Sequence, residues 1–287
     1  RRVGRMPSRR TGVPAAAEPH RRPRRGGSAR SLMNTVIGEF VVPGTGRVWT
    51  SALVRALALF QVDEAATRQA LFRSAAEGLL VREQEGRRVR WRLSPAGRRT
   101  AVAGAQRIYS FRSGRETWDG RWLLLEVSVP DDLRRLRLRR RLAWAGFGLL
   151  PSGVAITPHV GRETEALRIL SSLGLEAGAV SLLARIGTIG DAKRVVAEAW
   201  DLDELALRYR EFVAGVAEQR PRTDESTFVA HTRLVHEWRR FPFFDPGLPS
   251  ELLPRTWIGR EAKQVFDRHH AKWKPAAWRW FTTVNAQ

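Results

Sequence analysis

The sequence predicts an α+β protein with three parts: an N-terminal winged helix-turn-helix, a central ferredoxin-like βαββαβ domain and a mostly α-helical C-terminal domain. Three helical segments, a basic hairpin and a fourth helix follow one another within residues 31–113. Strand and helix patterns take the βαββαβ order over residues 114–192, and helical spacing of apolar residues dominates residues 193–287. The 287 residues suffice for two or three domains, and 43% of them are hydrophobic, which excludes global disorder.

The first 30 residues differ in composition from the rest of the chain. Residues 1–30 carry ten arginines against one acidic residue, Glu18, and have few large apolar side chains. Such a segment cannot bury enough surface to offset the entropy lost on ordering it. We therefore expect a disordered basic arm that adds nonspecific affinity for phosphates. An overlong start of the chain is the alternative explanation.

The predicted DNA-binding domain begins with an apolar helix over residues 31–42, which ends at Pro43. Thr50 or Ser51 is expected to cap a second, short amphipathic helix. Asp63 is expected to cap a third helix that stops at Gly78. The third helix is the segment that a helix-turn-helix protein inserts into the major groove.

A hairpin and a fourth helix complete this domain. Two strand-like segments, Val81–Glu85 and Arg88–Leu93, flank a turn at Gly86. Ser94 followed by Pro95 is a typical start of the next helix. The order helix, turn, helix, hairpin, helix is typical of a winged helix.

The third helix divides into two faces. Helical spacing places Thr67, Leu71 and Ser74 on one stripe, which we expect to face the core. Arg68 and Gln69 fall outside this stripe, near the end of the helix that enters a groove first. Arginine pairs with guanine and glutamine with adenine at base edges, so these two residues are predicted to recognise sequence.

The second strand of the hairpin alternates between basic and apolar residues. Because side chains alternate across a strand, Arg88, Arg90 and Arg92 share one face. A row of guanidinium groups suits a wing that rests on phosphates or enters a minor groove, although a solvated strand face has the same pattern. The full set of expected DNA contacts is Thr50, Ser51, Arg68, Gln69, Phe72, Arg73, Arg88, Arg90 and Arg92.

Charge and composition narrow the class of partner. The formal net charge is +21 and the sequence pI is about 11.6, which favours polyanions such as nucleic acid. The chain has no cysteine, which excludes disulfides and cysteine-ligated metal centres. Its apolar runs are too short to cross a bilayer, so a cytoplasmic protein without membrane partners is expected.

Four segments carry a resemblance to a known family. Residues 49–80, 118–130, 142–158 and 238–259, in this order, resemble the PaaX family of bacterial repressors, named for control of phenylacetic acid degradation. The resemblance spans about residues 31 to 281. It implies a homodimer that binds double-stranded DNA at an inverted-repeat operator. Binding of an aromatic acyl-CoA effector would release this dimer from the operator.

The resemblance also raises an enzymatic alternative. The central domain of the family resembles a small nuclease subunit of CRISPR adaptation systems, and a metal-dependent nuclease needs a carboxylate at the end of its first strand. Here Asp131 and Asp132 come only after Pro130, where they suit a helix start. We therefore expect a non-catalytic scaffold that pairs subunits, with a nuclease or other nucleic-acid-processing enzyme as the alternative. An architectural protein or RNA-binding protein is the third possibility.

An acyl-CoA effector needs arginines for its phosphates and an apolar slot for its acyl group. The densest such cluster surrounds residues 236–244, and a weaker one heads the first strand of the central domain. The predicted effector residues are Trp118, Arg121, His236, Trp238, Arg239 and Arg240. A helix end packed under a loop has the same composition as the first cluster, since aromatic runs often form core.

No cofactor or metal site is expected from the sequence. His231 and His236 are five residues apart, so they diverge by about 140° on a helix. His269 and His270 are adjacent and cannot share one ion on a regular helix. Phosphate-binding glycine loops, nucleophile elbows and catalytic triads are also missing from the sequence, so no catalytic residue is predicted.

Overall fold

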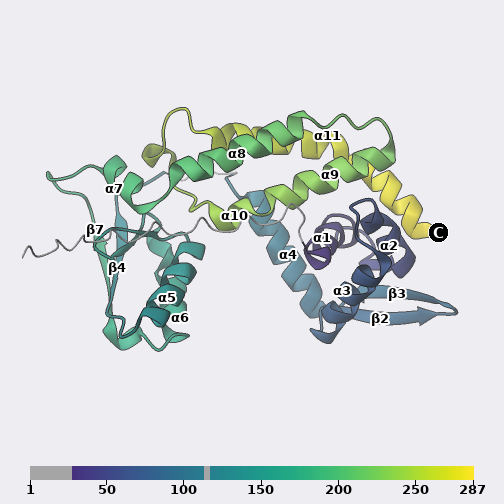
Figure 1. The fold of residues 1–287 in the computed structure, drawn as a ribbon, viewed down its shortest axis with the longest axis horizontal. Helices are drawn as coiled ribbons and strands as arrows, with labels where there is room; N and C mark the ends of the chain where they lie inside the picture. The colour runs from purple at the N-terminus through teal and green to yellow at the C-terminus, as the bar shows by residue number, and fades with distance from the viewer. Residues whose placement is uncertain (1–27, 113–116) are drawn as a thin grey trace, which may run out of the picture.

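The computed structural model describes residues 28–112 and 117–287, and it is a mixed α+β fold with two antiparallel sheets (Figure 1). A lobe with the three-stranded sheet and a lobe with the four-stranded sheet lie side by side, and long C-terminal helices run along both (Figure 1). Most of the predicted basic arm lies outside the described residues. Its last residues are ordered, because Ser28 caps the first helix and Arg30 pairs with Glu77. Within the described ranges, no helix is long and apolar enough to span a bilayer.

The N-terminal lobe contains residues 28–112. Its elements are α1 (Ala29–Val36), the π-helical η1 (Ile37–Val41), β1 (Arg47–Trp49), α2 (Thr50–Ala58), α3 (Glu64–Ala76), β2 (Leu80–Glu85), β3 (Arg88–Leu93) and α4 (Pro95–Ser110). The sheet order is β1-β3-β2, with Val48 opposite Trp91 and Arg82 opposite Trp91 on its other side. Strand β1 is absent from the sequence analysis because its three residues are too few for an alternating pattern.

Local chemistry fixes the ends of α3 and the start of α4. The Asp63 carboxylate accepts a hydrogen bond of 2.7 Å from the Ala66 backbone N–H, as the capping prediction requires. Gly78 ends the helix with a φ of +72°, a conformation that favours glycine. At the start of α4, a Cβ on Gly97 would lie 2.0 Å from the Leu79 carbonyl oxygen. Only glycine therefore lets α4 pack this closely on the strand that follows α3.

The cap predicted for α2 is wrong. Trp49 is its N-cap residue, and no side chain caps the helix. The Thr50 hydroxyl instead donates to the Val89 carbonyl and accepts from Trp91 Nε1, at 3.0 and 2.9 Å. These bonds tie α2 to the hairpin, because the short strand β1 directs Thr50 inward.

The central part, residues 117–191, has the predicted βαββαβ order. It comprises β4 (Trp122–Val127), α5 (Asp132–Trp144), β5 (Gly148–Leu149), β6 (Ala155–Thr157), the 3-10 turn η2 (Val160–Arg162), α6 (Glu163–Ser171), the 3-10 turn η3 (Glu176–Gly178) and β7 (Ala179–Ala184). Its sheet is antiparallel in the order β5-β6-β4-β7. Leu123 and Leu125 pack under α5 and α6, whereas Trp122 on the opposite face joins the core of the C-terminal helices.

The C-terminal part is helical. It comprises α7 (Ala192–Ala199), α8 (Leu202–Ala217), α9 (Asp224–Trp238), the short α10 (Phe241–Phe244), the 3-10 turn η4 (Ser250–Leu252) and α11 (Ile258–Ala286). The helical spacing expected in this part is present in α8, where Leu205, Tyr209, Phe212 and Val216 are buried. Helix α11 has 29 residues and continues through Pro275.

The core of the N-terminal lobe is completed by the other end of the chain. Helices α9 and α11 contribute side chains to the same buried cluster as α1, α2 and α3. The contributing residues are Phe228 of α9, Trp280, Phe281 and Val284 of α11, and Met33, Leu53, Leu57 and Leu71 of the lobe itself. Phe40 stacks on Phe281 with ring centroids 5.1 Å apart. The C-terminal helices therefore support the lobe that carries α3, so a change in their position reaches α3 directly.

Candidate nucleic-acid interface and adjoining cavity

The two predicted faces of α3 are both present. Thr67, Leu71 and Ser74 are buried, whereas Arg68 and Gln69 are exposed. Arg68 Nε donates to Glu64 Oε1 at 2.7 Å, one helical turn away, so the guanidinium is held near the start of the helix. Surface pairs of this kind contribute little energy and exchange readily for another acceptor.

Phe72 and Arg73 are also on the exposed side of α3. Phe72 is 56% exposed and meets the edge of the buried Trp91 ring, with centroids 5.7 Å apart. An exposed aromatic ring on this face offers apolar contact to a thymine methyl group. Ser51 is exposed in the first turn of α2, but Thr50 is buried. The prediction that Thr50 contacts DNA is therefore wrong, because its hydroxyl is used inside the lobe.

The hairpin arginines have different surroundings. Arg92 Nε donates to Glu83 Oε1 at 2.8 Å, and Arg90 lies 3.5 Å from the same carboxylate and 3.2 Å from Glu85. The hydrogen bond from Arg92, helped by the charges of the neighbouring arginines, lowers the pKa of Glu83. Arg90 and Arg92 are therefore paired with cross-strand carboxylates in the protein alone, and their contact with DNA stays a prediction.

Arg88 differs from its two neighbours in β3. It is exposed, and its guanidinium lies 4.0 Å from the centre of the Trp49 ring. Within the described ranges no carboxylate pairs with it. Arg82 and Arg87 are likewise exposed on the hairpin, which projects away from the rest of the lobe (Figure 1). Arg82 is on β2, whose sequence lacks the row of alternating arginines that marks β3.

The structure does not bring the predicted effector residues together. Trp238 is completely buried and packs on Phe266, with ring centroids 4.8 Å apart, so it is core. Arg240 pairs with Glu237 on the surface. Trp118 Nε1 donates to the Arg121 carbonyl at 2.8 Å, and Arg121 pairs with an aspartate two residues before it. These residues are close in the sequence, but their side chains point in different directions in the structure.

One of these residues, Arg239, lines a cavity, and His236 bonds Thr35, which also lines it. His236 Nδ1 lies 2.9 Å from Thr35 Oγ1, and Arg239 Nη1 donates to the same hydroxyl and to the Ser31 carbonyl, both at 2.7 Å. Burial lowers the pKa of His236 to about 4, with smaller contributions from Arg239 and Arg240, so the imidazole is neutral near pH 7. Burial also lowers the pKa of Arg239.

The cavity lies between α1 with η1, helix α4 and helix α9, and its volume is about 260 Å³. Its lining is mainly apolar. The lining residues are Asn34, Thr35, Ile37, Gly38, Glu39, Ser74, Leu79, Leu80, Leu93, Gly97, Thr100, Ala101, Gly104, Ala105, Arg107, Ile108, Tyr109, Val235, Arg239 and Phe243. The cavity therefore borders α3 through Ser74 and borders the hairpin strands through Leu80 and Leu93.

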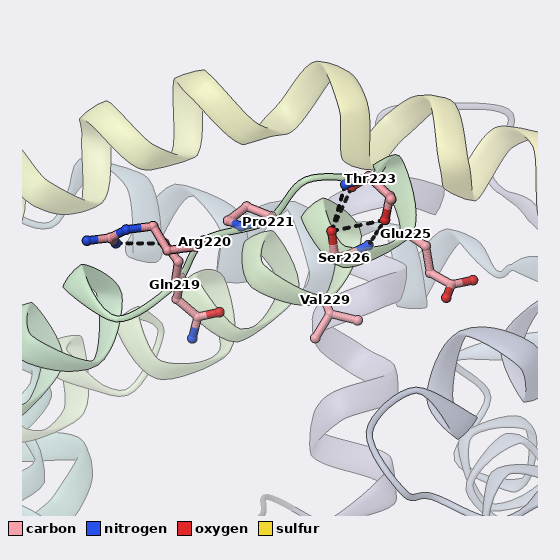
Figure 2. Close-up of a pocket in the computed structure, with 7 residues that line it drawn as sticks. All are labelled: Gln219, Arg220, Pro221, Thr223, Glu225, Ser226 and Val229. Carbon is pink, nitrogen blue, oxygen red and sulfur yellow. Dashed lines mark hydrogen bonds between the residues drawn. The ribbon is translucent and has the colours of Figure 1, made fainter.

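A second, more open hollow lies at the loop between α8 and α9 (Figure 2). Thr223 and Ser226 hydrogen-bond each other there as a capping box for α9. Arg220 donates to the Gln219 carbonyl beside it. The polar groups of this hollow are thus used in the turn itself, which leaves little to recognise a ligand.

Two histidines and a glutamate meet inside the molecule. His231 and His270, from α9 and α11, approach Glu39 of η1. The spacing of histidines along the chain does not indicate this meeting, because the three residues belong to three different elements. The carboxylates required by a nuclease are not assembled: Asp131 caps α5 and pairs with Arg134, and Asp132 pairs with Arg135. The central domain therefore does not favour the nuclease alternative.

An α+β chain that exposes arginines on a helix beside an arginine-bearing hairpin has the features of a DNA-binding transcriptional regulator. Residues 28–97 match the family described as PaaX-like protein, residues 115–196 the PaaX protein central Cas2-like domain, and residues 200–283 the PaaX-like protein C-terminal domain. The chain belongs to the PaaX family of transcriptional regulators.

Two known proteins are similar over most of the chain. The transcriptional repressor PaaX of Escherichia coli (strain K12) is 29% identical over 261 residues, which cover 87% of this chain and 82% of that protein. The solved structure of the uncharacterized protein Rv0674 from Mycobacterium tuberculosis has a TM-score of 0.58 and 24% identity, and the match covers 87% of this chain and 98% of that one. The second comparison supports the fold alone.

Proposed function

We propose that this regulator is a repressor that reads double-stranded DNA through a winged helix-turn-helix. Helix α3 is the recognition helix, and the β2–β3 hairpin is the wing. The observation that carries the proposal is the exposed side of α3, where Arg68 and Gln69 stand out from a helix whose other side is fully packed. A rigid helix with short polar side chains at its leading end suits the major groove. Such a repressor acts where the chromosome lies, in the cytoplasm.

The topology supports this assignment. A strand before α2 pairs with the hairpin in the order β1-β3-β2, so the wing is anchored to the helix-turn-helix and keeps a fixed angle to it. The central sheet order, β5-β6-β4-β7, supports a ferredoxin-like domain. DNase footprinting on the DNA upstream of the gene tests the function. We expect protection of a short inverted repeat, and uniform binding with no protected site would contradict the proposal in favour of an architectural protein.

We also propose that the regulator is a homodimer paired through its central domain. Strand β7 is at the edge of the four-stranded sheet, and Val180, Leu182 and Leu183 on it are each more than half exposed. An exposed apolar edge strand is a template for pairing with another strand. Light scattering of Val180→Lys with Leu182→Lys should show a monomer. Leu167→Lys, on the exposed side of α6, is the matched control and should leave the dimer intact.

For the effector we propose an aromatic or similarly apolar acyl-CoA that places its acyl group in the 260 Å³ cavity. A cavity of about 150 Å³ holds a benzene ring, so the acyl group fits but the nucleotide must remain outside. Arg239 is half-buried, and Arg107 is exposed. Within the described ranges neither has a carboxylate partner, so both offer charge to an anionic ligand.

A ligand in this cavity contacts the recognition helix α3 directly, so its effect on α3 needs no intermediate elements. A ligand there touches Ser74 of α3 on one side and α9 on the other. Release of DNA follows if the ligand prefers a spacing of these helices that the operator-bound state does not have.

Thermal-shift measurements with acyl-CoA thioesters and their free acids, followed by DNA-release assays, test this proposal. Ala105→Phe fills the cavity and should abolish the ligand shift. Ala103→Phe, exposed on the same helix and outside the lining, should retain it. Equal loss of the shift in both variants, or equal retention, would refute the assignment of the cavity.

A further inference from the structure

Three helices that are far apart in the sequence bring two imidazoles and one carboxylate to a single buried point. Glu39 Oε1 lies 2.9 Å from His231 Nε2 and 3.0 Å from His270 Nε2. The three ligating atoms all lie within 4.8 Å of one another. The side chains of Glu39, His231 and His270 are 4%, 0% and 17% exposed, so the cluster is shielded from water.

The backbone that delivers the carboxylate is unusual. Glu39 is the central residue of the π-helical segment η1, in which the Val42 N–H donates to the Ile37 carbonyl five residues earlier, at 3.0 Å. Helical π turns are rare and are found disproportionately at functional sites. The segment follows α1 without a break, so the wider turn is a local departure at the residue that meets the two histidines.

The carboxylate is held in one orientation by its neighbours. An ion bound to these three ligating atoms replaces the two hydrogen bonds that the Nε2 atoms make to Glu39. His231 Nδ1 is buried and has no hydrogen-bond partner within the described ranges. Tyr109 donates to the second oxygen of Glu39 and so orients the carboxylate.

We propose that Glu39, His231 and His270 bind a divalent first-row transition-metal ion. Two imidazoles and one carboxylate are ligands that suit Zn²⁺, Co²⁺, Ni²⁺ or Fe²⁺, and they do not suit Ca²⁺ or Mg²⁺, which prefer oxygen ligands only. Because η1 belongs to the DNA-reading lobe and the histidines to α9 and α11, the ion fastens that lobe to the C-terminal helices. The metal site does not rest on the proposed DNA recognition, and Glu39 and Tyr109 also line the cavity beside α4.

The test uses the full-length protein after removal of metal with a chelator. Titration with Co²⁺ should saturate at one ion per chain and develop visible absorption bands. His270→Asn should weaken Co²⁺ binding by at least about 100-fold. His269→Asn is the matched control, because His269 is adjacent on α11 and bonds only the Val265 carbonyl of its own helix, at 2.9 Å. Absence of saturable binding by the wild type, or equal binding by the two variants, overturns the proposal.

Two measurements on intact protein cover the case in which His270→Asn fails to fold. X-ray absorption of the Zn²⁺-loaded wild type should show two imidazole ligands, and any other histidine count overturns the proposal. Saturating Zn²⁺, at about 100 times its Kd, should raise the Tm by at least about 5 °C, whereas the same concentration of Mg²⁺ should not. Tyr109→Phe should reduce the affinity about 10-fold, as loss of an orienting hydrogen bond does.

Discussion

Helix α3 and the hairpin strand β3 both present basic residues at the spacing of their own element, yet the structure treats them differently. The exposed side of α3 keeps Arg68 and Gln69 at the surface. In β3, Arg90 and Arg92 are held by Glu83 from the neighbouring strand. A periodic pattern determines which face a side chain occupies, but a cross-strand neighbour determines whether its charge remains available to a ligand.

The largest expected difference is in the free energy of unfolding, between substitutions on the buried and on the exposed face of α3. Leu71→Ala should lower the free energy of unfolding by about 2–5 kcal/mol, because Leu71 is completely buried and its loss leaves a cavity. Arg73→Ala, on the exposed face, should change it by less than about 0.5 kcal/mol. Urea unfolding measures both, and a large loss in the second variant would show that the exposed face is packed.

The next effect concerns recognition. Arg68→Ala and Gln69→Ala should each weaken binding to the protected operator by about 1–3 kcal/mol, since each removes hydrogen bonds to a base edge. Binding to a scrambled duplex should change much less. Fluorescence anisotropy with both duplexes measures the difference. If operator binding survives both substitutions, α3 does not recognise sequence.

The contrast between α3 and β3 predicts that one substitution in the hairpin increases the affinity for DNA. Glu83→Gln removes the carboxylate that pairs with Arg92, so the Arg92 guanidinium becomes available to phosphates, whereas Arg90 keeps its closer partner, Glu85. Nonspecific DNA binding should tighten at low salt, and the slope of log K against log salt should steepen by about 0.9 for each arginine released. Glu85→Gln, which affects only Arg90, should have a smaller effect. An unchanged slope in Glu83→Gln would show that the hairpin does not approach DNA.

The smallest expected difference is in DNA affinity, between substitutions of two arginines on the single strand β3. Arg88→Ala should weaken binding to all DNA alike and reduce the salt slope by about 0.9, because Arg88 is exposed and lies over Trp49 without a carboxylate partner within the described ranges. Arg90→Ala should have a weaker effect, since its charge is already paired. Salt titrations of the two variants side by side decide the order, and the reverse order would indicate that DNA displaces Glu83.

The location of the effector cavity could not be predicted from local sequence patterns. Aromatic and basic residues clustered at 236–244 predicted a pocket there, but Trp238 and Phe241 are core because α8 and α11 cover them. The cavity is lined mainly by α1, η1 and α4, which are apolar segments without any ligand-like motif. An amphipathic helix has the same pattern whether its apolar face meets another helix or leaves a gap.

The sequence alone determined the βαββαβ order of the central domain, the capping of α3 by Asp63 and the two faces of that helix. These features depend on neighbours within one or two turns or within a single hairpin, so the periodicity and the capping chemistry encode them. Only the tertiary structure decided that Thr50 is internal, that Glu83 pairs with Arg92 and that Glu39 meets His231 and His270. Each of these contacts joins residues on different elements, and the packing of whole helices and strands, which no local pattern encodes, places them together.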